Sequence, residues 1–288
     1  MNGIILVDKP KDWTSHDVVG KLRGILHERR IGHSGTLDPL ATGLLVVFVG
    51  RATRAVEFAE ADSKEYIAGL RLGITTDTQD ITGNILHESE QNVSENELNS
   101  VIPEFVGDIQ QIPPMYSAIK VGGKKLYELA RKGEEIERKP RKINISKLSV
   151  CGRDGEDYII DVCCSKGTYI RTLCNDIGER LGCGACMSSL RRVKAGAFNI
   201  SEAHTLDEIA LCPEKYILPV DTLFSRYPEL TVSESIDKRL RCGSFVRVSG
   251  ADGIYRVYNE TREFLLLGEI RDGALKTIKN FFEVTDGK

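Results

Sequence analysis

The stretch that most constrains the fold is residues 32–45, a turn-rich segment that runs directly into an apolar one. It holds three glycines, one histidine and one aspartate, and residues 44–49 are all apolar. Asp38 stands before Pro39, and a proline favours an extended conformation in the residue that precedes it. We therefore expect a buried strand over residues 46–49, with Asp38 held in a defined pose near its edge.

The same dipeptide also has a purely structural interpretation. An aspartate at the N-cap with proline at the first helical position is a common start for an α-helix. A functional Asp38 would need a cation nearby in space, because a buried carboxylate is costly unless it is paired. Local pattern favours the capping interpretation, and spacing alone does not identify an arginine partner.

The chain length and its apolar content bound the class of protein. With 288 residues, the chain suits one large domain and a small one. No apolar run reaches the length of a membrane span. The N-terminus becomes charged at Asp8, too early for a signal peptide. We therefore expect a cytoplasmic protein that does not interact with a membrane.

The eight cysteines raise the question of a metal site. Cys183 and Cys186 form a C-x-x-C pair, but there is no second pair, nor a histidine pair, at ligand spacing. We therefore expect reduced thiols and no bound metal.

Charge is distributed unevenly although the net charge is only −3. Residues 74–119 hold eight acidic side chains and no Lys or Arg, whereas residues 120–142 hold nine basic ones against four Glu. Residues 165–194 hold six against two. Charge runs usually form solvated faces, but basic surfaces of this kind also attract a phosphate backbone. We expect residues 120–142 to form a projecting, mobile element that becomes ordered on a partner.

Periodicity predicts an alternation of strands and helices. Ser15 is expected to cap a helix that Arg29 and Arg30 end, and Ser94 begins a capping box. Residues 219–228 are expected to be a linker to a small β-rich domain. The other expected elements are strands at 64–73, 157–164, 245–248, 253–258, 264–270 and 274–284, a short helix from Leu126 that ends at Gly133, helices at 170–181 and 205–211, and turns at 75–84.

A hydrolase interpretation rests on Ser34 and His33. Residues 32–36 almost form a nucleophile elbow, but Thr36 stands where the second glycine is required. Neither a Walker loop nor a dinucleotide fingerprint is present in the sequence. The residues by themselves suggest a protein that acts on RNA and leave the reaction open.

Four stretches in order resemble the motifs of the TruB family, the tRNA pseudouridine synthases that modify uridine 55 of the T-loop. Residues 32–45 resemble the catalytic motif, with Ser34 where many members have threonine. Residues 64–80, 111–131 and 164–192 resemble the second, third and fourth motifs. The C-terminal part resembles the family's PUA-type RNA-binding appendage only in its position and β-character.

The resemblance implies an α+β fold. We expect a pseudouridine-synthase domain over residues 1–222, whose mixed, largely antiparallel β-sheet is flanked by helices. Residues 120–142 would be its thumb-like insertion. A small β-rich, PUA-like RNA-binding domain would follow over residues 229–288.

The resemblance also implies roles for particular residues. Asp38 would be the nucleophile, Tyr66 would stack on the target base, and Arg171 would pair with the aspartate. His33 would wedge into the T-loop, and Tyr169 and Leu190 would line the pocket. The basic residues expected to contact RNA are Lys64, Lys120, Lys124, Arg131 and Lys142. Each of three residues also has a structural alternative. Tyr66 could be a plain core tyrosine, Arg171 a surface arginine and His33 a turn cap.

The implied reaction breaks the glycosidic bond from C1′ to N1 and rejoins the uracil through C5. It involves no redox change and consumes no phosphate, so no cofactor or metal is expected. Asp38 could attack C1′, attack C6 or assist a glycal-like intermediate, while the Tyr66 hydroxyl could move the C5 proton. The expected partner is the T-arm of tRNA, bound by a monomer without a protein partner. The alternative is an RNA-binding protein or tRNA folding chaperone that acts without catalysis.

Overall fold

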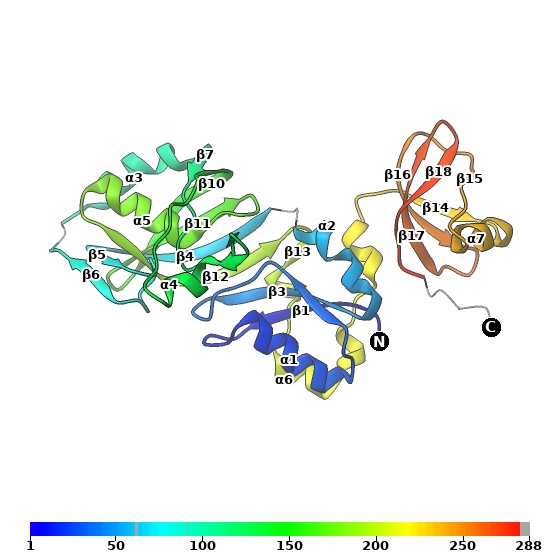
Figure 1. Ribbon diagram of the computed structural model, residues 1–288, viewed down its shortest axis with the longest axis horizontal. Coiled ribbons are helices and arrows are strands. Elements are labelled where there is room, and N and C mark those ends of the chain that lie inside the picture. The colour runs from blue at the N-terminus through cyan, green and yellow to red at the C-terminus, as the bar shows by residue number, and fades with distance from the viewer. Residues whose placement is uncertain (61–62, 91, 283–288) are drawn as a thin grey trace.

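Two β-sheets organise the chain (Figure 1). The computed structural model describes residues 1–60, 63–90 and 92–282. A nine-stranded sheet has the order β1-β3-β12-β4-β11-β10-β7, with β2 paired to β3 and β13 to β12. Its strands are β1 (Gly3–Lys9), β2 (Ile31–Ser34), β3 (Thr42–Val49), β4 (Lys64–Leu72), β7 (Gly107–Gln111), β10 (Arg141–Asp154), β11 (Asp157–Cys164), β12 (Ala185–Ala195) and β13 (Phe198–Asn199).

The nine-stranded sheet is antiparallel except where β12 runs parallel to β3. The α-helices are α1 (Ser15–Leu26), α2 (Val56–Glu60), α3 (Glu95–Val101), α4 (Leu126–Ala130), α5 (Ile170–Leu181), α6 (Leu206–Leu211) and α7 (Glu234–Arg241). Short 3-10 helices span Gly50–Ala55, Ile102–Phe105, Ile200–Glu202, Pro213–Tyr216 and Val220–Phe224. The predicted α+β class, with a mixed and largely antiparallel sheet, is confirmed.

The apolar run after the turn-rich stretch forms β3, which is buried on both faces as predicted. Val47 packs with α1, while Val46 packs on the opposite side with Phe224. A run without polar alternation is what a strand covered on both faces requires. Gly43 at its start is also required, because a Cβ there would lie 2.4 Å from the carbonyl oxygen of Arg192 on β12.

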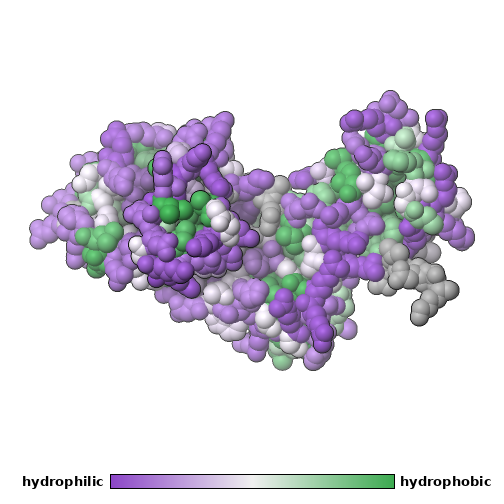
Figure 2. Space-filling view, viewed as in Figure 1, coloured by the Kyte–Doolittle hydropathy of each residue, from purple (hydrophilic) through white to green (hydrophobic). Residues whose placement is uncertain are grey.

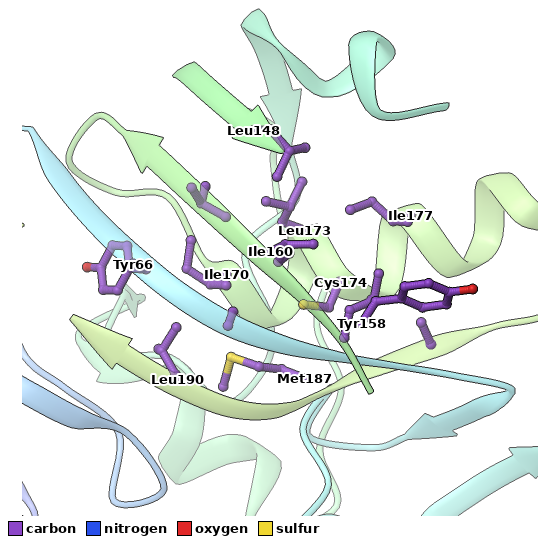
Figure 3. Close-up of a cluster of buried hydrophobic side chains, with 14 of the residues drawn as sticks. Tyr66, Leu148, Tyr158, Ile160, Ile170, Leu173, Cys174, Ile177, Met187 and Leu190 are labelled. Carbon is purple, nitrogen blue, oxygen red and sulfur yellow. The ribbon is translucent and has the colours of Figure 1, made fainter. Parts of the chain in front are cut away.

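The next predicted strand, β4, carries one face of the main core. Tyr66, Ala68, Leu70 and Leu72 are all buried. Figure 3 shows this core between α5 and the strands β4, β11 and β12. Helix α5 ends as predicted at Gly182, which adopts the left-handed conformation.

Two predictions about capping are wrong. Thr14, not Ser15, caps α1, through a reciprocal capping box with Asp17. The dipeptide Asp38-Pro39 does not start a helix either. The Ala41 amide donates to the Asp38 carbonyl oxygen at 3.1 Å, which closes a turn, and β3 begins one residue later.

Two segments for which no strand was expected, residues 75–84 and the basic segment 120–142, each take part in a short β-hairpin. Residues 75–84 were expected to be turns, but 75 and 76 belong to β5 (Ile74–Thr76), and only 77–84 form the turn that joins it to β6 (Ile85–Glu88) in a hairpin. All residues of β6 are exposed, so the sequence lacks the alternation that predicts a half-buried strand. The basic segment forms the hairpin β8 (Lys120–Val121) and β9 (Lys124–Lys125), followed by α4. Its last two residues, 141–142, instead begin β10.

The predicted linker is a packed segment. Val220, Leu223 and Phe224 are buried, and the Phe224 ring lies 6.1 Å from Phe264 and 5.8 Å from Phe281, centroid to centroid. This contact joins the part of the chain built on the nine-stranded sheet to the C-terminal sheet. The linker prediction was wrong because the apolar side chains of this stretch, which lies between two prolines, are buried in tertiary contacts.

The C-terminal sheet has five strands in the order β14-β16-β17-β18-β15. They are β14 (Glu229–Val232), β15 (Val246–Arg247), β16 (Gly253–Asn259), β17 (Phe264–Arg271) and β18 (Ala274–Asn280). The predicted strands are present, although the first is shorter and residues 283–284 lie outside the described residues. The strand β14 and the helix α7 were not predicted.

All eight cysteines are free thiols, with Cys186 buried and Cys183 half-buried. Among the residues that the structure describes, no three metal-ligating side chains cluster. No helix within those residues is long and apolar enough to cross a membrane.

Candidate active site

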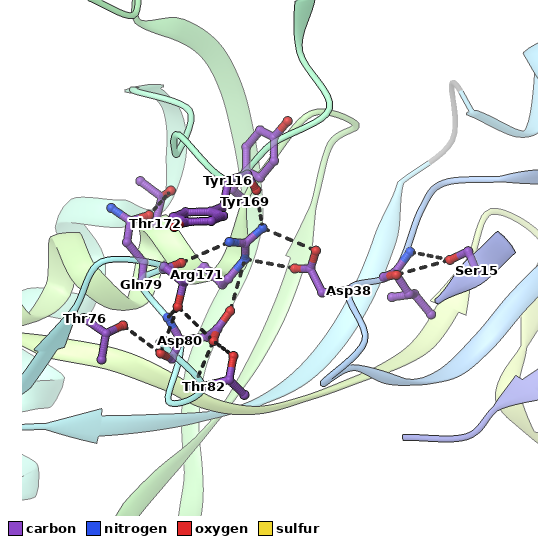
Figure 4. Close-up of polar contacts among 12 residues, drawn as sticks. Ser15, Asp38, Thr76, Gln79, Asp80, Thr82, Tyr116, Tyr169, Arg171 and Thr172 are labelled. Carbon is purple, nitrogen blue, oxygen red and sulfur yellow. Dashed lines mark hydrogen bonds and ion pairs between the residues drawn. The ribbon is translucent and has the colours of Figure 1, made fainter. Parts of the chain in front are cut away.

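Asp38 lies in the loop between β2 and β3, and Arg171 reaches it from the first turn of α5 (Figure 4). Arg171 Nε lies 2.9 Å from Asp38 Oδ2, and its Nη2 lies 3.3 Å from Oδ1. This two-point contact fixes the carboxylate in both position and orientation. The cation that a functional Asp38 requires is therefore present.

The surroundings of the pair hold the arginine more tightly than the aspartate. The Arg171 side chain is 6% exposed and that of Asp38 is 38% exposed. Arg171 also donates from Nη1 to the Thr78 carbonyl oxygen at 3.0 Å and from Nη2 to the Tyr116 carbonyl oxygen at 2.9 Å. A fixed, buried guanidinium thus presents a carboxylate that remains accessible.

A second carboxylate, Asp80, lies behind the first. Its Oδ2 is 3.9 Å from Arg171 Nε, and its side chain is 9% exposed. Asp80 Oδ1 accepts hydrogen bonds from the Thr78 hydroxyl at 3.0 Å and from the Thr82 amide at 3.0 Å. Arg171 therefore lies between one accessible carboxylate and one buried carboxylate. No role was predicted for Asp80 from the sequence, although it lies in residues 64–80, which resemble the second family motif.

Tyr66 on β4 is 8% exposed and lies in the core cluster that also contains Leu37 (Figure 3). Burial raises the pKa of the Tyr66 hydroxyl, the Arg192 cation beside it opposes that rise, and the negative charge of Asp38 adds to it. The phenol is therefore protonated at neutral pH. Tyr66 lies close enough to Arg192 and Asp38 for both charges to affect the pKa of its hydroxyl.

Arg192 on β12 was overlooked as a site residue. It is 1% exposed and lies directly across from Tyr66 in the β12–β4 register. Its Nε donates to the Leu44 carbonyl oxygen at 2.7 Å and its Nη2 to the Gly35 carbonyl oxygen at 3.0 Å. One guanidinium thus links the first residue of the Asp38 loop to β3, the strand that follows the loop. The sequence signal was an arginine in a strand whose alternation places it on the buried face.

His33 on β2 is half-buried, and its Nδ1 atom is buried without a hydrogen-bond partner among the described residues. Burial lowers the pKa of the His33 imidazole, and the Arg192 and His16 charges lower it further. The ring is therefore neutral at physiological pH. A neutral ring suits stacking between bases better than an ionic contact with phosphate.

Two further residues were expected to line the pocket, and of these Tyr169 lies beside Arg171 (Figure 4). Tyr169 is the N-cap residue of α5, and its amide and carbonyl are both held by the Gln111 side chain, at 2.8 and 3.1 Å. Burial raises the pKa of the Tyr169 hydroxyl. Leu190 on β12 is 8% exposed and belongs to the same core cluster as Tyr66.

The basic residues expected at the RNA differ in exposure. Lys120 and Lys124 are exposed on the β8–β9 hairpin. Arg131 is exposed, with its guanidinium 5.5 Å from the centre of the Tyr127 ring. Lys142 pairs with Asp108 at 2.8 Å, and Lys64 is only 8% exposed. The two hairpin lysines are thus the best placed to meet a phosphate.

The hydrolase interpretation fails on geometry. Ser34 and His33 are consecutive residues of β2, so their side chains point to opposite faces of the sheet. Ser34 is also 3% exposed. A serine nucleophile requires a base within hydrogen-bond reach, and His33 cannot serve as one.

Two protein-family models match the chain. The one described as TruB family pseudouridylate synthase (N terminal domain) matches residues 23–170. The one described as tRNA pseudouridylate synthase B C-terminal domain matches residues 171–225. The boundary between the models falls between Asp38 and its partner Arg171. The two matched parts therefore contribute to one site.

Curated relatives match over nearly the whole chain. Proteins named tRNA pseudouridine synthase B from Clostridium kluyveri and Clostridium acetobutylicum are 43% and 44% identical to it. The first alignment covers 98% of this chain and 100% of the relative, and the second covers 97% and 99%.

Solved structures share the fold. A chain in the structure of an H/ACA RNP bound to a substrate RNA containing 2′-deoxyuridine aligns with a TM-score of 0.74 and 25% identity. A chain in a Cbf5-Nop10-Gar1 complex also has a TM-score of 0.74, with 27% identity. Each alignment covers 98% of this chain, and they cover 86% and 85% of the other chains. The predicted pseudouridine-synthase fold is thereby confirmed.

Proposed function

The chain belongs to the TruB family of pseudouridylate synthases, and from this premise we propose that it isomerises uridine 55 in the T-loop of tRNA with Asp38 as the nucleophile. As a family member it is an isomerase that converts uridine in tRNA to pseudouridine. The position in the tRNA and the residue roles are the proposed part.

The observation that carries the proposal is the two-point contact between Arg171 and Asp38, at 2.9 and 3.3 Å. A buried guanidinium that contacts a carboxylate at two points fixes its position and orientation, which every route to the product needs. The routes are attack at C1′, attack at C6, and assistance to a glycal-like intermediate. Each requires a fixed carboxylate with one open side.

The side chains near Asp38 would give a flat base a binding place that excludes water. Tyr66 offers an aromatic face for stacking on the uracil, and its hydroxyl could relay the proton that C5 loses after bonding to C1′ toward N1, which gains one in the product. Leu190 and Tyr169 would cover the base and exclude water, which would otherwise hydrolyse a detached sugar. The uridine must first leave the stack of the loop, at a cost of a few kcal/mol.

Contacts to RNA outside the pocket would offset that cost. We assign them to the exposed lysines of the β8–β9 hairpin and to His33, which would fill the space left by flipped bases. The proposed units are residues 1–222, with the thumb-like segment 120–142, and a PUA-like domain at 229–288. On the face drawn in Figure 2, hydrophobic side chains gather in separate patches, which supports a monomer as the working form.

The direct test is to map pseudouridine in an unmodified T-arm stem-loop after incubation with the protein. We expect conversion at position 55 only, and none in a stem-loop with cytidine at that position. Absence of pseudouridine, with tight binding of the stem-loop, would support the alternative of an RNA chaperone. Conversion at another uridine would contradict the assigned position.

A further inference from the structure

The Ser15 hydroxyl serves the Asp38 loop and not the helix that contains it. Thr14 already caps α1, so the Ser15 side chain is not needed there. Ser15 Oγ instead accepts a hydrogen bond from the Leu37 amide at 2.9 Å and donates one to the Leu37 carbonyl oxygen at 3.2 Å (Figure 4). Ser15 is 1% exposed, so water does not compete for either bond.

These two bonds hold both polar backbone groups of the residue before Asp38. The residue after it is held as well, because the Pro39 carbonyl oxygen accepts from the Asp12 amide at 2.8 Å and from Lys9 Nζ at 3.4 Å. The loop itself has no regular secondary structure between β2 and β3. Its position relative to α5 therefore depends on contacts from residues 9–15.

We propose that Ser15 is a positioning residue, which fixes the backbone at Leu37 so that the Asp38 carboxylate stays in register with Arg171. This inference rests on the proposed role of Asp38. Without the hydroxyl, a buried amide and a buried carbonyl would both lack a partner, and the loop would shift to find one. A misplacement of about 1 Å at a reacting group can cost about 100-fold in rate.

The experiment compares Ser15→Ala with its neighbour Thr14→Ala, both measured on tRNA. Thr14→Ala removes the helix cap and is the matched control, because the hydrogen bonds of its side chain to described residues lie within the exposed first turn of α1. We expect Ser15→Ala to lower the single-turnover rate by about 10- to 100-fold, with tRNA affinity within about twofold of the original. Thr14→Ala should keep the rate within about twofold although its melting temperature falls by roughly 2–4 °C.

A Ser15→Ala rate within twofold of the original would overturn the proposal. Equal rate losses in the two variants would also overturn it, because they would trace the effect to stability. Ser15→Thr keeps the hydroxyl and should recover the rate to within about threefold. If Ser15→Thr is as slow as Ser15→Ala, the hydroxyl is not the group that positions the Asp38 loop.

A measurement on the unaltered protein covers the case in which Ser15→Ala does not fold. The Leu37 amide should exchange its hydrogen as slowly as amides of β3, because its partner is buried. Exchange at the rate of an open loop would overturn the proposal. Full activity of Asp38→Asn would instead contradict the proposed function, and the two failures are thus distinguishable.

Discussion

At the scale of single residues, Arg192 and Arg191 form a natural pair for comparison. Arg192 is 1% exposed, and its two hydrogen bonds satisfy the carbonyl oxygens of Gly35, at the start of the Asp38 loop, and of Leu44 in β3. Arg191 pairs with Asp8 at 2.7 Å, and its side chain is 43% exposed. Hydrogen bonds from a charged donor are worth about 1.5–3 kcal/mol each, whereas an exposed ion pair contributes about 0–1 kcal/mol.

We therefore predict that Arg192→Met lowers the free energy of unfolding by about 2–4 kcal/mol. The loss is smaller than the sum of the two hydrogen bonds because the variant no longer buries a cation. Arg191→Met should lower it by at most about 1 kcal/mol. Urea unfolding of both variants checks this. Similar losses in the two would show that the buried guanidinium does not hold the loop.

His33 makes the stability depend on pH. Its pKa is lowered from the ordinary value of 6.5, mainly by burial, so the unfolded chain binds the proton more readily. Stability is then complete above pH 6.5 and is lost as the pH falls toward and through the pKa of the folded state.

We predict that the stability of the protein falls more steeply between pH 7 and pH 5 than that of a His33→Gln variant. The excess cannot exceed about 1.4 kcal/mol per pH unit, the limit for one proton. Thermal unfolding across this range measures it. Parallel pH profiles for the two proteins would contradict the assignment of a neutral, buried imidazole.

At the scale of elements, local patterns predicted what depends on local sequence. The alternation of β4 and the glycine that ends α5 were both readable from the chain. The partner of Asp38 was not, since Arg171 lies 133 residues further along and only the resemblance proposed it. Ser15 was misread because a serine next to a threonine offers two equivalent caps, and tertiary contacts decide between them.

The β8–β9 hairpin is the element with a testable electrostatic role. Lys120 and Lys124 are exposed, whereas Lys142 is already paired with Asp108. Each phosphate contact contributes about 0.7–0.9 to the slope of log K against log salt concentration.

We predict that Lys120→Ala and Lys124→Ala each reduce the salt slope of tRNA binding by about 0.7–0.9, and that Lys142→Ala reduces it less. Lys147→Ala on β10 is the control, because that side chain is also exposed but is paired with Asp161 and is not among the residues proposed to contact RNA. Filter binding from low to moderate salt gives the slopes. A slope unchanged by both hairpin variants would remove the hairpin from the proposed RNA surface.

At the scale of the whole molecule, the site depends on contacts that cross the chain. The Asp38 loop is held by residues 9–15 from the N-terminus and by Arg192 from β12, and Arg171 comes from α5. The C-terminal sheet is joined to this body through the rings of Phe224, Phe264 and Phe281. Residues far apart in sequence thus converge on one carboxylate, the proposed centre of the reaction.

The most direct test is the rate of pseudouridine formation at position 55 of unmodified tRNA by Asp38→Asn. Asp157→Asn is the matched control, because it alters another aspartate that pairs with an arginine, Arg71, outside the site. We predict that Asp38→Asn binds tRNA within about threefold of the original affinity and forms no detectable product, while Asp157→Asn keeps the original rate. Product formation by Asp38→Asn at the original rate would contradict the account.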